Sequence, residues 1–589
     1  MDNPFQVKVP DEISADDVVD LFVDVFADFN QVLEKGHTFL NGHRGSGKSM
    51  MFRFIMPDCQ KIACKKELHD LDFFALYIPI KKTDINIPAL EKLKSHEDYF
   101  LSEHLLATYI LSKSLNAIVD AFGDELNQYT SEIQKFHDKE FLDLLLFSGY
   151  KTLKFENDKG KNYFINMSEV VSNMLRECMM YCKSYAVSRK DEGYFGPLLD
   201  FINCVYPFLI KLKQLSFFAK DRPFYILIDD AGHLTLSQTR ILNTWVSYRT
   251  TGDICFKIST QLDYKTHLTI NGKRIDSPHD YSEVNISTRY SSKTSIYSER
   301  IEQIVKKRIN KYLGVPIDNI DVKKFFPENQ KQKQELEILS IEIKEKYKDI
   351  EKSYAGLDAN KRYTVSEYVK SLKQHRSGYN YSYSGFDQLV SISSGIFRQF
   401  LEPAQRMYLM CFEKYEGQTP DYITDSVQNS IIKVYSEEFL TVEFDKIRKD
   451  KDSKEHTNKA DMLFNLINSL GELFHKIFVS DLTERIVFSI ALTTNPNEQL
   501  KEILDMGEQY GYLHKGTIGN KQGTGRNPLY ILSRLLAPYF KLDSSSFSGY
   551  QNMTSETLSI ALNDKNRFLR AFDKKFKDNK DLPSLFNEN

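Results

Sequence analysis

The stretch Gly42-His43-Arg44-Gly45-Ser46-Gly47-Lys48-Ser49 decides the fold class, because it is a full match to the phosphate-binding pattern G-x4-G-K-[ST]. An apolar strand is expected before it, at 37–40, and a helix after it. The glycines let successive backbone N–H groups surround the phosphates of a nucleotide, and the helix adds the positive end of its dipole. Lys48 is expected to reach the β- and γ-phosphates and the Ser49 hydroxyl to bind Mg²⁺. These eight residues therefore predict a nucleotide site with Mg²⁺.

Apolar runs on both sides of this loop predict a parallel sheet. The most apolar of them, Phe224-Tyr225-Ile226-Leu227-Ile228, has the length of a buried strand. Strands that alternate with helices are typical of an α/β fold in which helices cover both faces of a parallel sheet. The expected strands are 37–40, 73–80, 224–228, 254–258 and 284–286, and the expected helices of this part are 11–35, 49–59 and 235–249.

Two acidic residues, Asp229 and Asp230, directly follow the strand 224–228. Asp229 is predicted to hold Mg²⁺ through water, as strand-terminal acidic residues do beside a P-loop. Asp230 occupies the position of a carboxylate that positions or activates the attacking water. Because aspartate has a shorter arm than glutamate, we expect slow hydrolysis, or a switch that holds ATP for long periods. The alternative, a strand that merely ends in a polar turn, is less favoured next to a P-loop.

Two further sites complete the predicted catalytic set. Ser259 and Thr260 end the strand that begins at residue 254, where a small hydroxyl can hydrogen-bond the γ-phosphate or the attacking water, and Thr260 is the preferred candidate. Arg398 follows Gly395 at the start of a helix, from which it can point at the phosphates out of a lid domain. The competing interpretations are a strand end that is polar for structural reasons and an ordinary surface arginine.

The remaining chain is predicted to be mostly helical. The stretch 97–220 shows long runs of 3.6-residue periodicity, and helices resume from about residue 298. The charged stretch 328–352 has apolar residues at three- and four-residue steps. A helix packed on its own domain is favoured there over a coiled-coil arm, because fewer than four heptads are present. The polar run 449–461 is expected to be a linker.

Residues 462–545 are predicted to form a winged helix. Helices are expected at 482–492 and 498–510, followed by a hairpin with a glycine-rich tip at 516–527 and a return strand at 529–532. The tail after residue 546 is polar and mixed in charge.

The hairpin is a candidate for contact with nucleic acid, because the stretch 509–542 contains no acidic residue. Basic side chains on such a wing can lie against phosphates. The helix 498–510 is acidic, however, and unsuited to a phosphate-lined groove. A packing or partner module is therefore favoured, with wing contact to DNA or RNA as the alternative. The basic residues of that wing are Lys515, Lys521 and Arg526.

Taken in order, the P-loop, the acidic strand end, the strand-terminal Ser-Thr, the Gly-x-x-Arg of a lid and a C-terminal winged helix resemble an AAA+ ATPase of the origin-recognition (ORC-like) type, in its bacterial version. The Asp229-Asp230 pair is also similar to that of STAND P-loop ATPases. The resemblance covers most of 1–545 and implies an α/β P-loop fold with helical lid, ATPase activity, and ATP and Mg²⁺ as cofactors. The separation of Lys48 from Asp229, 229 − 48 = 181 residues, exceeds the family's usual spacing. It implies a helical insertion of about a hundred residues for recognition or docking.

The resemblance also implies partners. Such ATPases assemble into rings or partial rings when ATP is bound, and a neighbouring subunit supplies an arginine, for which Arg249, Arg274 and Arg289 are the candidates. Bacterial relatives with large insertions often occur in antiphage defence operons beside a separate effector, commonly a nuclease.

This organisation predicts seven segments. They are 1–96, the first part of the AAA+ core with the P-loop; 97–220, the insertion; 221–297, the second part of the core; 298–448, the helical lid with its charged insertion; 449–461, the linker; 462–545, the winged helix; and 546–589, the tail.

The amino-acid composition excludes some further classes of protein. The 78 Lys and Arg against 81 Asp and Glu leave a net charge of 78 − 81 = −3, which excludes a protein that coats nucleic acid by bulk attraction. The N-terminal sequence lacks the pattern of a signal peptide, and we expect no membrane association. Seven cysteines in mostly apolar context are typical of reduced thiols, and the expected location is the cytoplasm.

Three functional hypotheses follow. The first is a slowly hydrolysing, oligomerising AAA+ ATPase that controls a partner effector, in antiphage defence. The second is a DNA-binding initiator or helicase loader. The third is a scaffold that binds nucleotide without turnover.

Overall fold

The computed structural model divides the chain into two compact units. The five-stranded unit comprises Lys8–Gly42 and Gly47–Ile286, and the four-stranded unit comprises Met1–Val7, His43–Ser46 and Ser287–Asn589. The structure describes residues 3–577 except for 25–28, 81–94, 151–156, 158, 189–192, 249–251, 263, 287–293, 347–354, 375–380, 450–452, 481–486, 520–524 and 545–548.

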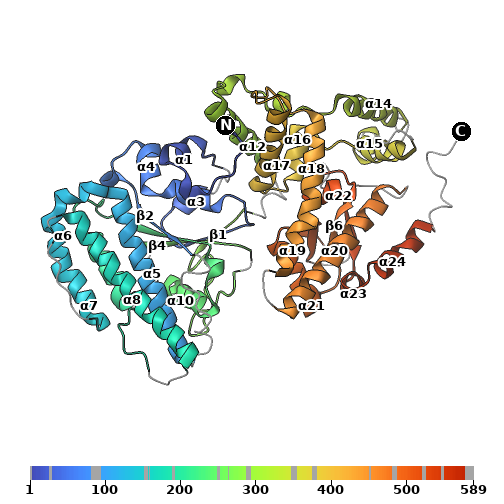
Figure 1. The fold of residues 1–589 in the computed structure, drawn as a ribbon. Helices are drawn as coiled ribbons and strands as arrows, with labels where there is room; N and C mark the ends of the chain where they lie inside the picture. The colour runs from blue at the N-terminus through green and yellow to red at the C-terminus, as the bar shows by residue number, and fades with distance from the viewer. Residues whose placement is uncertain are drawn as a thin grey trace. The chain divides into compact units, whose positions relative to one another are not determined.

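A parallel sheet in the order β2-β3-β4-β1-β5 forms the centre of the five-stranded unit (Figure 1). Successive residues of its strands face two different hydrophobic cores, since side chains alternate along a strand. On β3, Tyr225 packs with Phe52 on one face, whereas Ile226 packs with Leu106 on the other. The predicted α/β fold with helices on both faces is thereby confirmed. The strands are β1 (Thr38–Asn41), β2 (Phe74–Pro79), β3 (Phe224–Asp229), β4 (Ile254–Thr260) and β5 (Ser282–Asn285).

The helices of this unit begin close to the predicted positions with two exceptions. The expected helix 11–35 is wrong: its first helix ends at Phe22, whose backbone is extended and whose ring stacks on Phe54 at 3.9 Å. The expected helix 49–59 is interrupted at Met56, because a residue before proline disfavours helical backbone. The helices are α1 (Ala15–Leu21), α2 (Phe29–Leu33), α3 (Lys48–Ile55), α4 (Pro57–Cys64), α5 (Ser95–Phe122), α6 (Thr130–Phe136), α7 (Leu142–Ser148), α8 (Gly160–Ser188), α9 (Tyr206–Leu212) and α10 (Leu236–Ser247).

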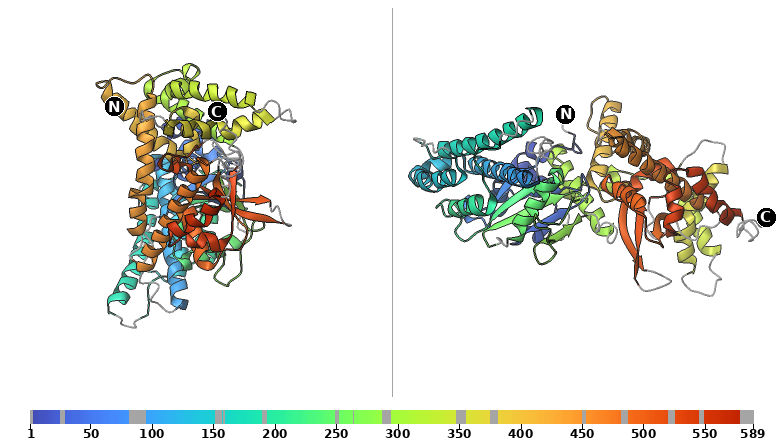
Figure 2. Two further views of the ribbon diagram at one scale, coloured as in Figure 1. Left: turned by 90° about the vertical axis from the view of Figure 1, so that its right-hand side faces the viewer. Right: turned by 90° about the horizontal axis from the view of Figure 1, so that it is seen from below.

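Residues 97–220 are mostly helical, as predicted, and their centre is the antiparallel pair α5 and α8 (Figures 1 and 2). The Oγ of Ser112 lies 2.7 Å from that of Ser172, and nearer the start of α5 the His104 ring lies 3.5 Å from the carbonyl of Met174. This layer is joined to α10, since the Trp245 indole donates to the Glu103 carboxylate at 3.0 Å. The insertion therefore packs directly on the helix that follows the acidic strand end.

One run among the described residues, Asp98–Ser148, is long and apolar enough by composition to cross a membrane. It comprises three separate helices, α5, α6 and α7, and 67% of its most apolar window is buried inside the fold. Most apolar residues of this run thus pack in the protein core, whereas Phe100, Leu146 and Phe147 are exposed.

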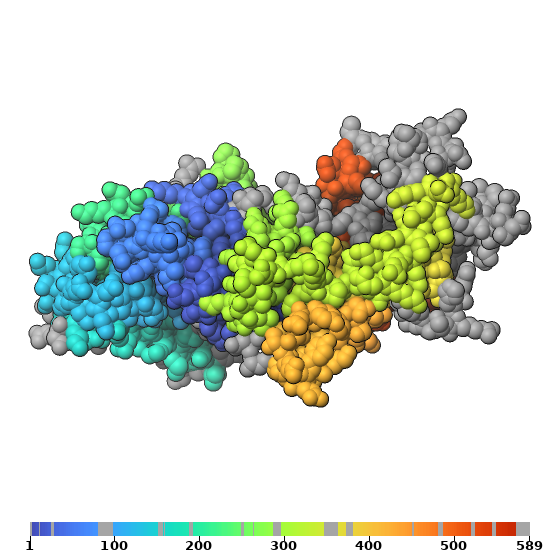
Figure 3. Space-filling model, turned by 90° about the horizontal axis from the view of Figure 1, so that it is seen from above, coloured from blue at the N-terminus to red at the C-terminus, as the bar shows by residue number. Residues whose placement is uncertain are grey.

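The four-stranded unit joins a helical region to a small mixed sheet in the order β7-β8-β6-β9. Segments 298–345 lie on one of its faces, yellow-green in Figure 3. The charged helix α14 packs on α15, so the described part of the stretch 328–352 is a helix packed within its own unit, as favoured. The strands are β6 (Val487–Leu492), β7 (Leu513–Gly519), β8 (Arg526–Leu532) and β9 (Gly549–Met553), and the helices are α12 (Thr294–Leu313), α13 (Val322–Phe325), α14 (Gln330–Lys346), α15 (Ala355–Gln374), α16 (Phe386–Ile392), α17 (Phe397–Lys414), α18 (Asp425–Leu440), α19 (Val442–Lys449), α20 (Lys454–Phe478), α21 (Glu498–Gln509), α22 (Ala537–Phe540), α23 (Ser555–Ile560) and α24 (Lys565–Lys577).

Two predictions for the C-terminal part are wrong, and the tail packs on the same core. The expected helix 482–492 is the buried strand β6 where it is described, because an apolar run of six residues fits a central strand equally well. The expected linker 449–461 is largely the start of α20, whose cap is the Ser453 side chain. The tail after 546 supplies β9 and α24, and Phe568 is fully buried in the same core as β6. The winged helix itself stays a prediction.

A short N-terminal segment also belongs to the four-stranded unit. Phe5 is fully buried, with its ring 6.0 Å from that of Phe325 and 6.2 Å from that of Tyr408. The Arg308 guanidinium donates to the carbonyls of Pro4 and Gln6 at 3.0 and 3.1 Å. The unit is therefore built from both ends of the sequence.

Candidate functional site

The P-loop follows β1 and leads into α3, as its pattern predicts. Gly45 and Gly47 have φ values of +84° and +96°, in the left-handed region that glycine adopts without steric cost. Lys48 starts α3, and its ammonium donates to the carbonyl of Gly42 at 2.7 Å. The Ser46 hydroxyl is buried and makes no hydrogen bond to the described residues. Buried polar groups are normally paired, so this hydroxyl and the helix N-terminus fit the phosphates of a nucleotide.

The other residues of the loop occupy two environments. His43 is buried and its ring meets the ring of His514 edge-on at 4.9 Å, within the four-stranded unit. Arg44 is exposed, and Ser49 lies half-buried in the first turn of α3. That position suits the predicted role of Ser49 as a Mg²⁺ ligand.

Parallel pairing brings the ends of three strands to one edge of the sheet. β1 pairs with β4 in a register that sets Asn41 opposite Thr260, and the N–H of Gly42 donates to the carbonyl of Thr260 at 3.3 Å. β4 in turn pairs with β3, which ends at Asp229. The P-loop, the acidic pair and the Ser-Thr pair thus lie together at the carboxyl edge, where ligands bind in open α/β sheets.

Asp229 is buried and accepts hydrogen bonds from three donors. Its Oδ2 accepts from the Tyr77 hydroxyl at 3.0 Å, and its Oδ1 accepts from the Ser259 hydroxyl and from the N–H of Asp230 at 3.1 Å. Hydrogen-bond donors on both oxygens of a carboxylate fix its orientation. Asp229 is therefore held in one orientation at the strand end, as a carboxylate that acts on Mg²⁺ through water requires.

Asp230 has the left-handed backbone, with φ 56° and ψ 44°. A non-glycine residue in this region is strained by about 1 kcal/mol or more, and such strain occurs often at functional sites. Its N–H donates to both Ser259 Oγ and Asp229 Oδ1. The same serine thus contacts the carboxylate of Asp229 and the backbone of Asp230.

The structure assigns the strand-terminal hydroxyls to neighbouring protein groups. Ser259 bridges Asp229 and Asp230, and Thr260 donates to the side chain of Asn41 at 3.1 Å and to the carbonyl of Gln261. Both hydroxyls are buried. Their predicted contact with the γ-phosphate stays a prediction.

Tyr77 and Asn41 are site residues that the sequence did not indicate. Tyr77 lies within an apolar strand, where an aromatic residue fits core packing equally well. Only the pairing of β2 with β3 brings it next to Asp229.

Arg398 lies next to the P-loop within the four-stranded unit. Its N–H donates to the carbonyl of Gly45 at 3.3 Å, and a Cβ on Gly45 would lie 2.7 Å from the Cβ of Arg398. Its guanidinium lies 3.7 Å from the Glu402 carboxylate on the next turn of α17. The backbone is thus fixed at the loop, while the side chain faces an acidic neighbour.

Of the three arginines considered for action in trans, Arg274 is 68% exposed and lies 3.3 Å from Asp276. Arg249 and Arg289 lie outside the described residues.

The hairpin β7–β8 carries the predicted basic residues. Lys515 lies 4.0 Å from the Asp505 carboxylate, and Arg526 donates to the Thr517 hydroxyl at 2.7 Å. Burial raises the pKa of Glu508 on the neighbouring helix α21. Lys521 lies outside the described residues.

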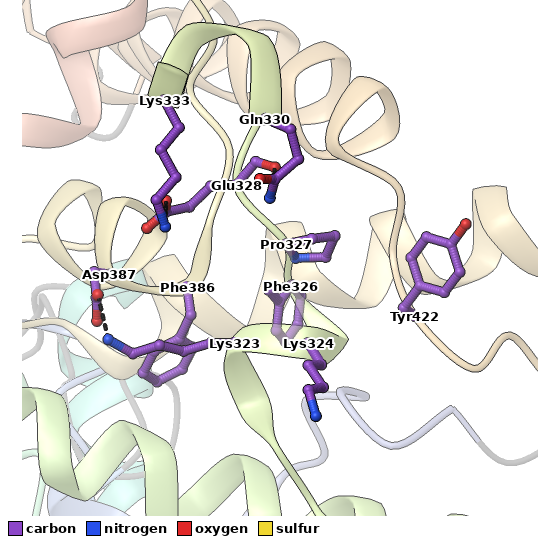
Figure 4. A pocket seen from close by; sticks show the side chains of 10 residues that line it. All are labelled: Lys323, Lys324, Phe326, Pro327, Glu328, Gln330, Lys333, Phe386, Asp387 and Tyr422. Atoms are coloured by element: carbon purple, nitrogen blue, oxygen red, sulfur yellow. Dashed lines mark hydrogen bonds and ion pairs between the residues drawn. The ribbon is translucent and has the colours of Figure 1, made fainter. Parts of the chain in front are cut away.

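A cavity of about 400 Å³ lies in the helical part of the four-stranded unit (Figure 4). Its lysines face carboxylates: Lys323 donates to Asp387 at 2.6 Å, and Lys333 lies 3.2 Å from Glu328. This pairing leaves little net charge for an anionic ligand. The lining residues are Lys323, Lys324, Phe326, Pro327, Glu328, Gln330, Lys333, Phe386, Asp387 and Tyr422.

The parallel sheet and the loop at its carboxyl edge define a P-loop NTPase of the AAA+ type. The chain belongs to the ORC-CDC6-like family, whose family model matches residues 3–551. Such AAA+ proteins generally bind ATP with Mg²⁺ and are ATPases of initiator type, with slow or inactive members among them. They also oligomerise and bind DNA.

Among solved structures, the chain is similar to the crystal structure of Cdc6p from Pyrobaculum aerophilum, at 9% identity and a TM-score of 0.28, over 97% of this chain and 98% of that one. No curated protein matches the sequence.

Proposed function

We propose that this protein binds and slowly hydrolyses ATP, oligomerises in its ATP-bound state, and controls a separate effector protein, a nuclease, in the cytoplasm during bacterial antiphage defence. The observation that carries the ATPase is the buried Asp229 carboxylate, fixed by Tyr77, Ser259 and the N–H of Asp230 at the sheet edge next to the P-loop. Mg²⁺ bound with ATP supplies charge neutralisation at the phosphate oxygens.

Each residue has a role in this proposal. Lys48 and the loop N–H groups hold the phosphates, Ser49 and Asp229 hold the ion, and Asp230 positions the water. Ser259 fixes the carboxylate of Asp229 and the backbone of Asp230, Thr260 supports the end of β4, and Arg398 approaches the phosphates from α17.

Slow turnover follows from Asp230. The N–H of Asp230 donates two hydrogen bonds that fix its left-handed backbone, and its side chain is shorter than that of a glutamate, so its carboxylate reaches less far toward an attacking water. A chain of this kind remains in its ATP state long enough to serve as a switch.

Support for a protein partner comes from exposed apolar residues at one end of the helical insertion. The N–H of Leu198 donates to the carbonyl of Ser148 at 2.9 Å, which joins the end of α7 to the loop before α9. Apolar side chains gain free energy by burial against protein, and patches of them mark interaction sites. The exposed side chains are Leu146 (68%), Phe147 (82%), Phe195 (93%) and Leu198 (42%).

An initiator or helicase loader is the second candidate, favoured by the family and by the basic hairpin β7–β8. Its DNA contact would be made by the wing alone, since the helix α21 is acidic and Lys515 already faces Asp505. A scaffold without turnover is the third candidate.

Steady-state phosphate release separates these functions. Lys48→Ala is expected to abolish turnover and weaken ATP binding, because the loop loses its phosphate-binding ammonium. Lys61→Ala, on the neighbouring helix α4, is the control and should leave turnover unchanged. Turnover that survives Lys48→Ala contradicts the ATPase, and a wild-type protein that binds ATP without releasing phosphate supports the scaffold.

DNA affinity that falls steeply with salt and is lost on Arg526→Ala supports the initiator.

A further inference from the structure

The turn between α16 and α17 carries Arg398 and has an unusual backbone. Ser394 and Gly395 both have positive φ, at 52° and 79°. Gly395 adopts this conformation freely, whereas a serine is strained there by about 1–2 kcal/mol. Something outside the turn must therefore stabilise Ser394 in this conformation.

Arg534, in a short 3-10 turn after β8, supplies that stabilisation. Its N–H donates to the Ser394 hydroxyl at 2.7 Å, and its guanidinium donates to the Ser391 hydroxyl at 3.1 Å. Ser391 in turn donates to the carbonyl of Ser544. Arg534 is 2% exposed, so these bonds form away from water, where an unpaired group costs most. The segment that follows the small C-terminal sheet thus holds one side of the turn through these hydrogen bonds.

The other side of the same turn contacts the P-loop tip. Ile396 and Arg398 are the side chains nearest to Gly45, and the N–H of Arg398 bonds its carbonyl at 3.3 Å. A shift of the turn would therefore move Arg398 relative to the loop.

Arg534 also lies near the histidine that contacts the loop. Burial and the Arg534 charge lower the pKa of His514 to about 4, so this ring is neutral where it meets His43. Two separate contacts, through Ser394 and through His514, thus connect the C-terminal sheet with the P-loop tip.

We propose that Arg534 and Ser394 are positioning residues for Arg398, through which the C-terminal sheet sets the rate of ATP hydrolysis. The inference rests on the proposed function, in which Arg398 acts on the phosphates. It adds that a ligand bound to the β7–β8 hairpin changes turnover through this turn, and that ATP changes the affinity for that ligand by the same factor.

Ser394→Gly tests the link, because glycine accepts the left-handed backbone but removes the hydroxyl that Arg534 holds. We expect kcat to fall about 10-fold or more with KM for ATP changed less than 3-fold, as a small misplacement of a catalytic group does. The thermal unfolding midpoint should stay close to that of the wild type, since strain relief offsets the lost hydrogen bond. Glu416→Gly, at another left-handed position with φ 52°, is the matched control and should leave kcat unchanged.

A double-mutant cycle gives the second readout. In an Arg398→Ala background, Ser394→Gly should have no further effect on kcat, because both changes act through the same group. Three results would overturn the inference while leaving the ATPase intact. They are additive effects of the two changes on kcat, an unchanged kcat in Ser394→Gly, and an equal loss of kcat in Glu416→Gly. If Lys48→Ala leaves turnover intact, the proposed function fails instead. If the wild type releases no phosphate, the same double-mutant cycle is measured with the Kd for ATP. Additive effects of Ser394→Gly and Arg398→Ala on that Kd would then overturn the inference.

Discussion

Three donors from three parts of the sequence fix the carboxylate of Asp229. Tyr77 comes from β2, Ser259 from β4 and the N–H of Asp230 from the next residue. A hydrogen bond to a charged group contributes about 1.5–3 kcal/mol, so each donor alone affects how well the carboxylate is aligned.

Tyr77→Phe is expected to raise the Mg²⁺ concentration needed for half-maximal ATP hydrolysis by about tenfold, because it removes one donor and keeps the ring. Phosphate release titrated with Mg²⁺ measures the shift. Tyr225→Phe is the control, since its hydroxyl donates to the carbonyl of Leu33 and not to the acidic pair. An equal shift in both variants would argue against a role for Tyr77 at the ion.

Elements built from local patterns were predicted well. The P-loop and β3 depend on neighbouring residues, and the helix expected at 235–249 is α10. β6 was missed because its parallel partner is β9, about sixty residues away in a tail whose own sequence is polar. Tyr77 was missed for a related reason, since the pairing of β2 with β3 cannot be inferred from the sequence of either strand alone.

α24 gives an element-scale prediction for that tail. Phe568 is fully buried against the core that holds β6 and α20. Phe568→Ala is expected to lower the free energy of unfolding of the four-stranded unit by about 3–5 kcal/mol, as large core truncations do. Denaturant unfolding measures this loss, and the exposed Arg570→Ala on the same helix should change it by less than about 0.5 kcal/mol. A small effect of both changes would mean that the tail folds separately from the core.

Across the whole molecule, buried histidines link stability to pH. Burial lowers the pKa of His37 to about 3 and that of His104 to about 4, with the Lys257 charge also acting on His37. The unfolded chain then binds more protons than the folded chain between about pH 4 and 6.5, so the free energy of unfolding falls as pH falls through that window.

We expect each of these two histidines to contribute up to about 3 kcal/mol of this loss. Urea unfolding at pH 7.5, 6 and 4.5 measures it. His104→Gln should flatten the dependence, whereas His69→Gln, at a 60% exposed side chain, should not. A dependence that is the same in His104→Gln as in the wild type would exclude this residue as the cause.

The burial of Phe5 among Phe325, Phe326 and Tyr408 has a consequence during synthesis. Phe325 follows Phe5 by 325 − 5 = 320 residues, which a ribosome adds in roughly 20 to 60 s. Throughout that interval the five-stranded unit can emerge and fold, while Phe5 has no native partner. The four-stranded unit must then bind a segment made long before it, so the core around Phe5 forms only after Tyr408 has been synthesised.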